Sequence, residues 1–338
     1  MKIFGGTPIL IAIGALAVAA GAGLVVTGRM APTPPPERVT FQLPWTHSAG
    51  YAGFYSADRM GDFARHGLEV SFLTGGPRRD PLATLLSGKA QFALANGAHL
   101  IRSRSEGNPV KAVACIFRRS PLVFITLAGS GITHPRHFAG KVIRASKQNT
   151  ATLNALTSRF GVDPSQYTVS ATRDLTKLYS GEVNVWGGYS AVSLVRIRQT
   201  GRKVNVINPN NYGVHFYYSC ITTTDRLIEE RPDVVERFVH ASLREGWPRA
   251  LRDPEKAAAL ITSYGTVVDL KIQTGIITVM LPLIDTGSGE IGWMEHDVWR
   301  YMADTLNRQG LLKTAVDPRD VYTLQFLNRV FGKVAEKS

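Results

Sequence analysis

The stretch RVTFQLPWTHSAGYAGFYSADRMGDFARHGLEVSFL, residues 38–73, decides the fold class. Its first residues, 38–43, alternate between polar and apolar side chains, which predicts a strand. A helix is predicted from 52 to 65, and Gly67 ends it. Residues 68–73 are a second apolar run of strand type. A strand, a helix and a strand in this order are the building block of a parallel sheet, so the chain is predicted to be an α/β protein.

The alternation continues on both sides of an apolar, strand-like segment at 122–127. Before it, we predict helices at 80–87 and 98–105 and strands at 92–94 and 110–117. After it, we predict strands at 142–143, 167–170, 183–186 and 204–207, and helices at 150–160, 175–179 and 191–198. A β-rich return at 213–222 precedes predicted helices at 225–230, 232–251, 254–264, 270–281, 295–309 and 318–330. This order predicts two α/β lobes with a helical C-terminal part, and the β-rich runs at 122–127 and 213–222 predict a two-strand hinge.

The N-terminal 36 residues differ in character from the rest of the chain. Residues 8–26 are apolar and uncharged, and they are long enough to cross a bilayer as a helix. Small residues such as those at 17–19 fit a cleaved secretory signal, and the length fits a retained anchor, so both alternatives stay open. The Pro-rich segment 31–36 predicts an extended spacer. No cysteine precedes Cys115, which excludes a lipoprotein anchor.

The charge and the cysteines narrow the class of partner. The net charge of +13 falls to +11 for the body when Lys2 and Arg29 are left out. No long Lys/Arg run and no zinc-knuckle spacing occurs, so we expect no nucleic-acid partner. A basic body fits a solvated surface, and it also fits an anionic solute. Cys115 and Cys220 are too few for a metal site by themselves, and they form either a disulfide or two buried thiols.

Several motifs, in order, resemble the NMT1/THI5-like branch of type II periplasmic binding proteins. They are LPWTHSAGYAGFYSADRMGDFARHGLEVSF at 43–72, LLSGKAQFAL at 85–94, RSEGNPVKAVACIFRRSPLVFITLAGSGI at 104–132, HFAGKVI at 137–143, LYSGEVNV at 178–185, ERPDVVERFVHASLREGWPRALRDPEKA at 230–257 and WRYMADTLNRQGLL at 299–312. The resemblance covers about residues 38–326, almost the whole body. It implies two lobes that close on a solute, with the first lobe at 37–124, the second at 125–218 and the return of the first at 219–338, after the N-terminal segment and linker at 1–36.

The candidate solute-binding residues follow predicted strands, because ligands of open α/β sheets lie beyond the carboxyl ends of the strands. Trp45 follows the first strand and is suited to stacking on a flat ring, and Tyr51 begins the next helix. Asn96 fits either a helix cap or a ligand contact, and Arg118 fits either a solvated side chain or a partner for an anion. In the second lobe the candidates are Ser146, Asn149, Thr150, Gly188, Tyr189 and Tyr212. Pyrimidine binders of the family often carry TNEP where this chain has 188–191, so the carboxylate that would pair with an aminopyrimidine is missing.

The resemblance implies the solute-binding component of an ABC importer, which acts outside the cytoplasmic membrane and works with a permease and an ATPase. The solute is expected to be small and aromatic or anionic, such as a thiamine-pyrimidine precursor or a sulfonate. We expect a monomer without catalysis, cofactor or metal, held at the cytoplasmic membrane if residues 8–26 are not cleaved. The alternatives are a membrane-tethered sensor and a THI5-like pyrimidine synthase. Family synthases use a His in the entry motif and a Cys-rich return motif, where this chain has Tyr51 and the single Cys220.

Overall fold

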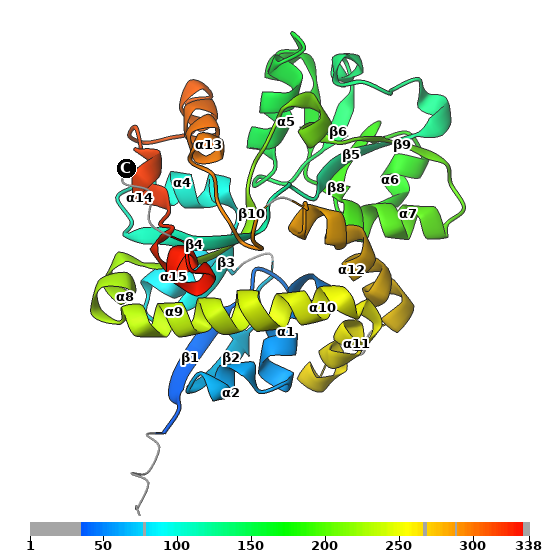
Figure 1. Ribbon diagram of the computed structural model, residues 1–338. Coiled ribbons are helices and arrows are strands. Elements are labelled where there is room, and N and C mark those ends of the chain that lie inside the picture. Colours follow the sequence, from blue (N-terminus) through cyan, green and yellow to red (C-terminus); the bar gives the residue numbers. More distant parts are fainter. Residues whose placement is uncertain (1–34, 77–78, 266–268, 288, 334–338) are drawn as a thin grey trace, which may run out of the picture. The chain divides into compact units, whose positions relative to one another are not determined.

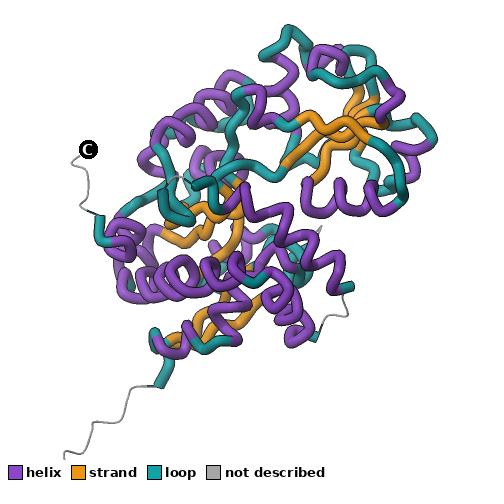
Figure 2. The backbone as a smooth tube through the Cα atoms, turned by 45° about the vertical axis from the view of Figure 1, so that its right-hand side comes forward, coloured by secondary structure: helices purple, strands orange, loops and turns teal. Residues whose placement is uncertain are grey.

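The computed structural model describes residues 35–76, 79–265, 269–287 and 289–333. The predictions for residues 8–26 and for most of the Pro-rich segment therefore lie outside the described residues. Within the described ranges, no helix combines the length and the apolar character needed to cross a membrane. The described residues from 36 onward form one compact unit, and the strands gather in two groups, each surrounded by helices (Figure 2).

The first sheet has the strand order β2-β1-β3-β10-β4. Its strands are β1 (Glu37–Gln42), β2 (Leu68–Leu73), β3 (Phe92–Ala95), β4 (Val110–Phe117) and β10 (Tyr218–Thr224). β1 is parallel to β2 and β3, as the opening motif predicts, whereas β10 runs antiparallel to β3 and β4. The last strand of the chain thus lies inside the first sheet. It begins at Tyr218, because residues 213–217, which we predicted to be part of it, lie in the crossover from the second lobe.

The second sheet repeats this plan with the order β7-β6-β8-β5-β9. Its strands are β5 (Leu122–Leu127), β6 (Val142–Arg144), β7 (Thr168–Ser170), β8 (Val185–Tyr189) and β9 (Val204–Ile207). β6 is parallel to β7 and β8, and β5 is antiparallel to β8 and β9. The chain therefore crosses between the sheets at 118–121 and 208–217, next to the lobe limits predicted at 124 and 218, which stay predictions.

The helices lie around the sheets as Figure 1 shows. They are α1 (Ala52–Arg59), α2 (Asp62–Arg65), α3 (Pro81–Leu86), α4 (Gly97–Ser105), α5 (Thr150–Ser158), α6 (Thr176–Tyr179), α7 (Val195–Gln199), α8 (Asp225–Glu230), α9 (Pro232–His240), α10 (Trp247–Arg252), α11 (Pro254–Ala259), α12 (Leu270–Ile284), α13 (His296–Arg308), α14 (Pro318–Val321) and α15 (Gln325–Phe331). The C-terminal helices α13, α14 and α15 pack on α4 and β4 of the first lobe. α12 contacts both the loop before α1 and the segment after β8, so it touches both lobes.

Three predicted helices are interrupted, each for a local reason. The helix predicted at 52–65 ends at Arg59 and resumes at Asp62, because Gly61 takes a left-handed conformation with φ of 73°. The helix predicted at 232–251 contains a π-helical turn at Ala241–Gly246 between α9 and α10. The helix predicted at 318–330 is split because Tyr322 is extended.

The close packing of α1 on α10 depends on two glycines. A Cβ added to Gly53 would lie 2.1 Å from the Trp247 ring, and one added to Gly246 would lie 2.2 Å from the carbonyl oxygen of Gly53. The Trp247 ring is fully buried and meets Phe54 edge-on at 5.7 Å between ring centroids. These contacts hold α1, which follows the loop at 43–51, against α10 of the first lobe.

Cys115 and Cys220 form a disulfide, an alternative that the sequence left open. The two residues face each other in the register of β4 and β10, and both are fully buried. β4 leads into one crossover and β10 follows the other, so the bond joins the two strands at the base of both connections.

Candidate functional site

Three tyrosines from different parts of the chain meet where the two lobes touch; we call them the tyrosine cluster. Tyr51 lies in the turn before α1, Tyr189 ends β8 of the second sheet, and Tyr218 begins β10 of the first sheet. The rings of Tyr189 and Tyr218 are 4.9 Å apart between centroids, and each tyrosine influences the pKa of the other. Tyr51 is close enough to both to influence their ionisation. The cluster therefore places contacts from both lobes at one point.

The hydroxyls of the tyrosine cluster are neutral donors at physiological pH. Burial raises the pKa of all three, since an ionised phenolate would lose its hydration there. The Tyr189 hydroxyl donates to Asn149 Oδ1 at 3.2 Å, and Asn149 lies at the start of α5. Neutral hydroxyls beside aromatic faces are suited to hold a flat solute with polar edges.

Two arginines of the second lobe give the site its charge. Arg144, at the end of β6, donates to the carbonyl oxygens of Gly187 at 2.5 Å and Thr172 at 3.1 Å. Burial, with a contribution from the nearby Arg173, lowers the pKa of Arg144. Among the residues that the structure describes, no carboxylate lies within ion-pairing distance of either arginine. The site is therefore electropositive.

Trp45 stands at the edge of this site, on the loop after β1. Its side chain is large and apolar, yet the residue is 47% exposed. The guanidinium of Arg173, from the other lobe, lies 5.8 Å from the centre of its ring. The Trp45 carbonyl oxygen accepts a hydrogen bond from the backbone N–H of Gly75 at 3.0 Å. A held backbone with an exposed ring is an arrangement suited to stacking.

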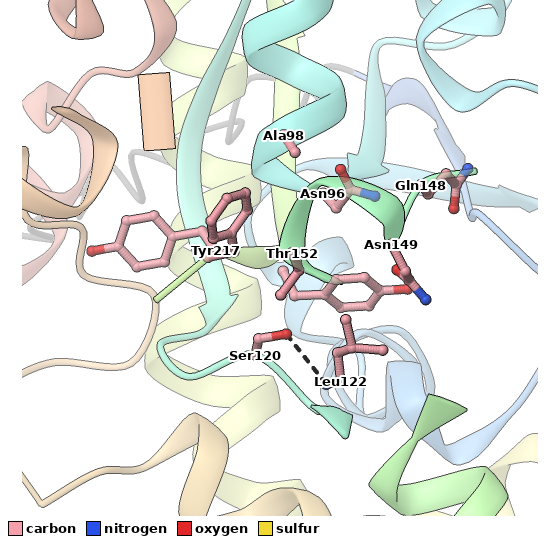
Figure 3. A pocket seen from close by; sticks show the side chains of 10 residues that line it. Asn96, Ala98, Ser120, Leu122, Gln148, Asn149, Thr152 and Tyr217 are labelled. Atoms are coloured by element: carbon pink, nitrogen blue, oxygen red, sulfur yellow. Dashed lines mark hydrogen bonds between the residues drawn. The ribbon is translucent and has the colours of Figure 1, made fainter. Parts of the chain in front are cut away.

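A small hollow lies beside the cluster, at the two crossovers (Figure 3). It is lined by Asn96, Ala98, Ser120, Leu122, Gln148, Asn149, Thr152, Phe216, Tyr217 and Tyr218. Its volume is about 10 Å³, which is roughly the space that one water needs. We expected a solute-sized gap between the lobes; at this place the side chains fill it. Admission of a flat solute therefore requires the lobes to move apart or the rings to turn.

Comparison with known proteins identifies the family. A family model described as "NMT1/THI5 like" matches residues 48–257, which is more than half of the chain. The chain belongs to the NMT1/THI5-like family. This confirms the resemblance read from the motifs.

Family relatives include both binding proteins and enzymes. The chain is 26% identical to the riboflavin-binding protein RibY of Chloroflexus aurantiacus, covering 86% of each chain. It is 23% identical to the formylaminopyrimidine-binding protein of Halalkalibacterium halodurans, covering 85% of this chain and 90% of that one. It is also 23% identical to the 4-amino-5-hydroxymethyl-2-methylpyrimidine phosphate synthase of Schizosaccharomyces pombe, over 71% of each chain.

Solved structures of the family's fold match as well. The periplasmic aliphatic sulphonate binding protein SsuA of Escherichia coli superposes with a TM-score of 0.65 at 14% identity, covering 90% of this chain and 96% of that one. At this identity the match speaks for the fold, and it confirms the predicted two-lobed α/β architecture.

The structure brings together some of the residues that the family pattern singled out. Trp45, Tyr51, Asn149 and Tyr189 lie at or beside the tyrosine cluster, as described above. Asn96 lines the hollow and also caps α4, since its Oδ1 accepts from the backbone of His99 at 2.7 Å. Both alternatives for Asn96 thus have a structural basis, and the role of all five in binding stays a prediction.

The other predicted residues have structural contacts that do not involve the tyrosine cluster. Arg118 bonds to Thr286 at 3.1 Å and to Glu295 at 3.4 Å, both in the C-terminal part. Tyr212 packs its ring against His134 and Phe160, with centroids 5.2 and 5.4 Å away. A role for Arg118 or Tyr212 in binding stays a prediction.

Ser146, Thr150 and Gly188 shape the loops of the second lobe. The Thr150 hydroxyl donates to the Ser146 carbonyl oxygen at 3.2 Å, which closes the turn before α5. A Cβ at Gly188 would lie 2.2 Å from Ser193 Oγ, so the strand end needs a glycine there. These residues position Asn149 and Tyr189, and direct contact with a solute stays a prediction.

Sequence reasoning missed Arg144, Arg173 and Tyr218. Arg144 ends a predicted strand and Arg173 follows the next one along the chain, so the rule that ligands lie beyond strand ends would have found both. Tyr218 was part of the aromatic run HFYY at 215–218, which was assigned to the hinge.

Proposed function

We propose that this protein is the extracytoplasmic solute-binding component of an ABC importer, and that its solute is an aromatic molecule with an anionic group. The observation that carries the proposal is the tyrosine cluster, which joins both lobes beside two arginines without a carboxylate partner among the described residues. Aromatic faces favour a flat ring, and unpaired guanidinium groups favour a carboxylate, phosphate or sulfonate. The riboflavin-binding and formylaminopyrimidine-binding relatives support the aromatic part of the proposal.

The anionic part of the proposal rests on the positive charge of the two arginines at the site. An aminopyrimidine edge is recognised by an acceptor such as a carboxylate, yet neither the cluster nor the hollow contains an Asp or Glu. A negatively charged solute would give Arg173 a counter-ion and would relieve its repulsion of Arg144. The ring of Trp45 would then cover the solute from the first lobe, in contact with Arg173 from the second.

Transport is favoured over catalysis by the chemistry of the side chains. The family resemblance implies that a synthase needs a histidine and a cysteine motif, whereas here the corresponding positions are Tyr51 and a segment whose one cysteine, Cys220, is held in a disulfide. A disulfide sulfur is neither a thiolate nucleophile nor a metal ligand. We propose that a permease and an ATPase receive the solute, and that residues 8–26 either direct export or retain the protein at the membrane.

The experiment compares pairs of ligands that share an aromatic ring system and differ in whether they carry an anionic group. Riboflavin and its 5′-phosphate form one pair, and a benzyl alcohol and the matching benzylsulfonate form another. Titration calorimetry should give at least tenfold tighter binding for the anionic member, because a charge-assisted hydrogen bond contributes about 1.5–3 kcal/mol. The variant Arg173→Gln should remove the difference, and the control Arg226→Gln, whose arginine pairs with Glu230 on the exposed face of α8, should keep it.

Native mass spectrometry of the purified protein would identify a co-purified solute directly. Equal affinity for charged and neutral members would overturn the anionic part of the proposal. Turnover of a bound compound by the protein alone would overturn the transport function.

A further inference from the structure

We propose that His66, His240 and Glu245 bind a divalent transition-metal ion of the zinc class in the first lobe. One donor atom from each of the three side chains lies within 4.8 Å of the other two. Glu245 Oε1 is 2.7 Å from His66 Nε2 and 3.5 Å from His240 Nδ1. None of these residues belongs to the tyrosine cluster or lines the hollow, so this site is independent of the proposed solute site.

The backbone brings the three side chains together by a specific device. His240 ends α9, and the next residues, Ala241–Gly246, form a π-helical turn. Bonds between residues five apart widen such a turn, so His240 and Glu245 come to lie on one face of it. His66 approaches from the other side, directly after α2 and before the left-handed Gly67. π-helical turns in longer helices are frequent at functional sites.

The carboxylate of Glu245 is already oriented for this role. Its second oxygen, Oε2, accepts from Arg65 Nη2 at 2.7 Å, and Arg65 is itself held by Asp62. Outer partners of this kind fix the direction of a metal ligand and leave one oxygen to face the ion. Here the oxygen that remains, Oε1, is the one that faces both imidazole rings.

A simple ion pair accounts for only part of this geometry. The contact between His66 and Glu245 is explained by one hydrogen bond. His240 Nδ1, however, is enclosed and has no hydrogen-bond partner among the described residues, and its ring centre is 4.6 Å from that of His66. An ion bound between the two rings would give His240 Nδ1 a partner. The cluster therefore has a gap in its bonding that a metal ion would fill.

The donor set selects the class of ion. Two imidazole nitrogens and one carboxylate oxygen are typical ligands of zinc, whereas magnesium and calcium prefer oxygen ligands. An ion about 2.0–2.2 Å from each donor sets the donors roughly 3.4 Å apart, so the His240–Glu245 contact of 3.5 Å already matches, whereas the His66–Glu245 contact of 2.7 Å lengthens when the ion binds. The side chains of His66, His240 and Glu245 are 25%, 37% and 23% exposed, so the cluster lies near the surface, and a turn of the His240 ring opens its enclosed Nδ1 to an ion and a coordinating water.

The test uses the tag-free, full-length chain after dialysis against a chelator. Calorimetry with zinc chloride should give one ion per chain, and cobalt chloride should give the visible absorption of a four-coordinate ion. His240→Ala should weaken zinc binding by about tenfold or more, because even outer-shell partners contribute about 10–100-fold to metal affinity. Magnesium chloride should give no heat that depends on His240.

Two controls separate this site from adventitious binding by other histidines. His99→Ala removes a histidine of the same lobe that pairs with Asp80, and it should leave zinc binding unchanged. The double variant His134→Ala/His137→Ala removes a partly buried pair of the second lobe whose rings lie near each other, and it should also leave zinc binding unchanged. Equal zinc affinity in wild type and His240→Ala, or loss of binding only in the double variant, overturns the proposal. Thermal unfolding without metal checks that His240→Ala remains folded.

Discussion

Removal of the Cys115–Cys220 disulfide should lower the free energy of unfolding by about 2–5 kcal/mol. The bond spans 105 residues of sequence. Closing a loop of about 100 residues lowers the entropy of the unfolded chain and so destabilises the unfolded state by about 4.7 kcal/mol. Because single domains are stable by only about 5–15 kcal/mol, the loss would be a large part of the total. Cys115→Ala/Cys220→Ala is the suitable variant, since both positions are buried and alanine leaves no polar group there.

Urea unfolding followed by tryptophan fluorescence measures the change, in parallel for the wild type with and without a phosphine reductant. Thiol quantification reports how many cysteines are free in each sample. The reductant should destabilise the wild type to the level of the double alanine variant and leave that variant unaffected. If the reduced wild type shows two free thiols per chain and yet has the same urea midpoint and the same slope of the unfolding transition as the oxidised wild type, the reasoning is refuted.

Three further predictions concern the core and the site. Gly53→Ala should lower the free energy of unfolding by about 1–3 kcal/mol, because the new Cβ meets the Trp247 ring. Gly275→Ala, in open space within α12, is the matched control and should be neutral or stabilising by up to about 1 kcal/mol; equal losses would contradict the packing argument. Trp45→Ala should weaken solute binding at least tenfold and change the free energy of unfolding by no more than about 0.5 kcal/mol, as for an exposed side chain; comparable losses in both would mean that the ring is only structural. In alkaline titration, the tyrosine cluster should stay protonated when free tyrosines ionise at about pH 10. Burial raises these pKa values in the folded state, so the stability that the tyrosines contribute is present below pH 10 and is lost as the pH rises further. Tyr189→Phe should therefore reduce the loss of stability at alkaline pH. An unchanged loss in this variant would contradict the direction of the pKa shift.

The sequence predicted the architecture well because the signals for it are local. The opening motif predicted β1, β2 and the helix between them. It did not predict the break at Gly61, because the sequence does not show that this glycine takes a left-handed conformation. The disulfide could not be decided, because pairing depends on β10 lying in register beside β4, a contact across 105 residues. The π-helical turn at 241–246 has no sequence signature that separates it from α-helix.

The candidate site was predicted less completely than the fold. The rule that ligands lie beyond strand ends singled out Trp45, Asn149 and Tyr189, which the structure places at or beside the tyrosine cluster, and their role in binding stays a prediction. An anionic solute was expected from the basic composition and from Arg118, but Arg144 and Arg173 were not singled out, because their importance depends on where they lie and on the lack of a carboxylate near them among the described residues. The resemblance to the family indicated which loops to consider, but it did not indicate which arginines of this chain lie at the site.

The position of β10 has a consequence for how the polypeptide acquires its structure. Although β10 is the last strand to be synthesised, it lies between β3 and β4, in the interior of the first sheet. A nascent chain that ends before Tyr218 would expose the edges of two apolar strands with nothing between them, whereas the second sheet would already have all of its strands. The first lobe, whose synthesis begins first, is therefore expected to complete its folding last. A ribosome-stalled or truncated product should contain a folded second lobe and an unprotected, aggregation-prone first lobe.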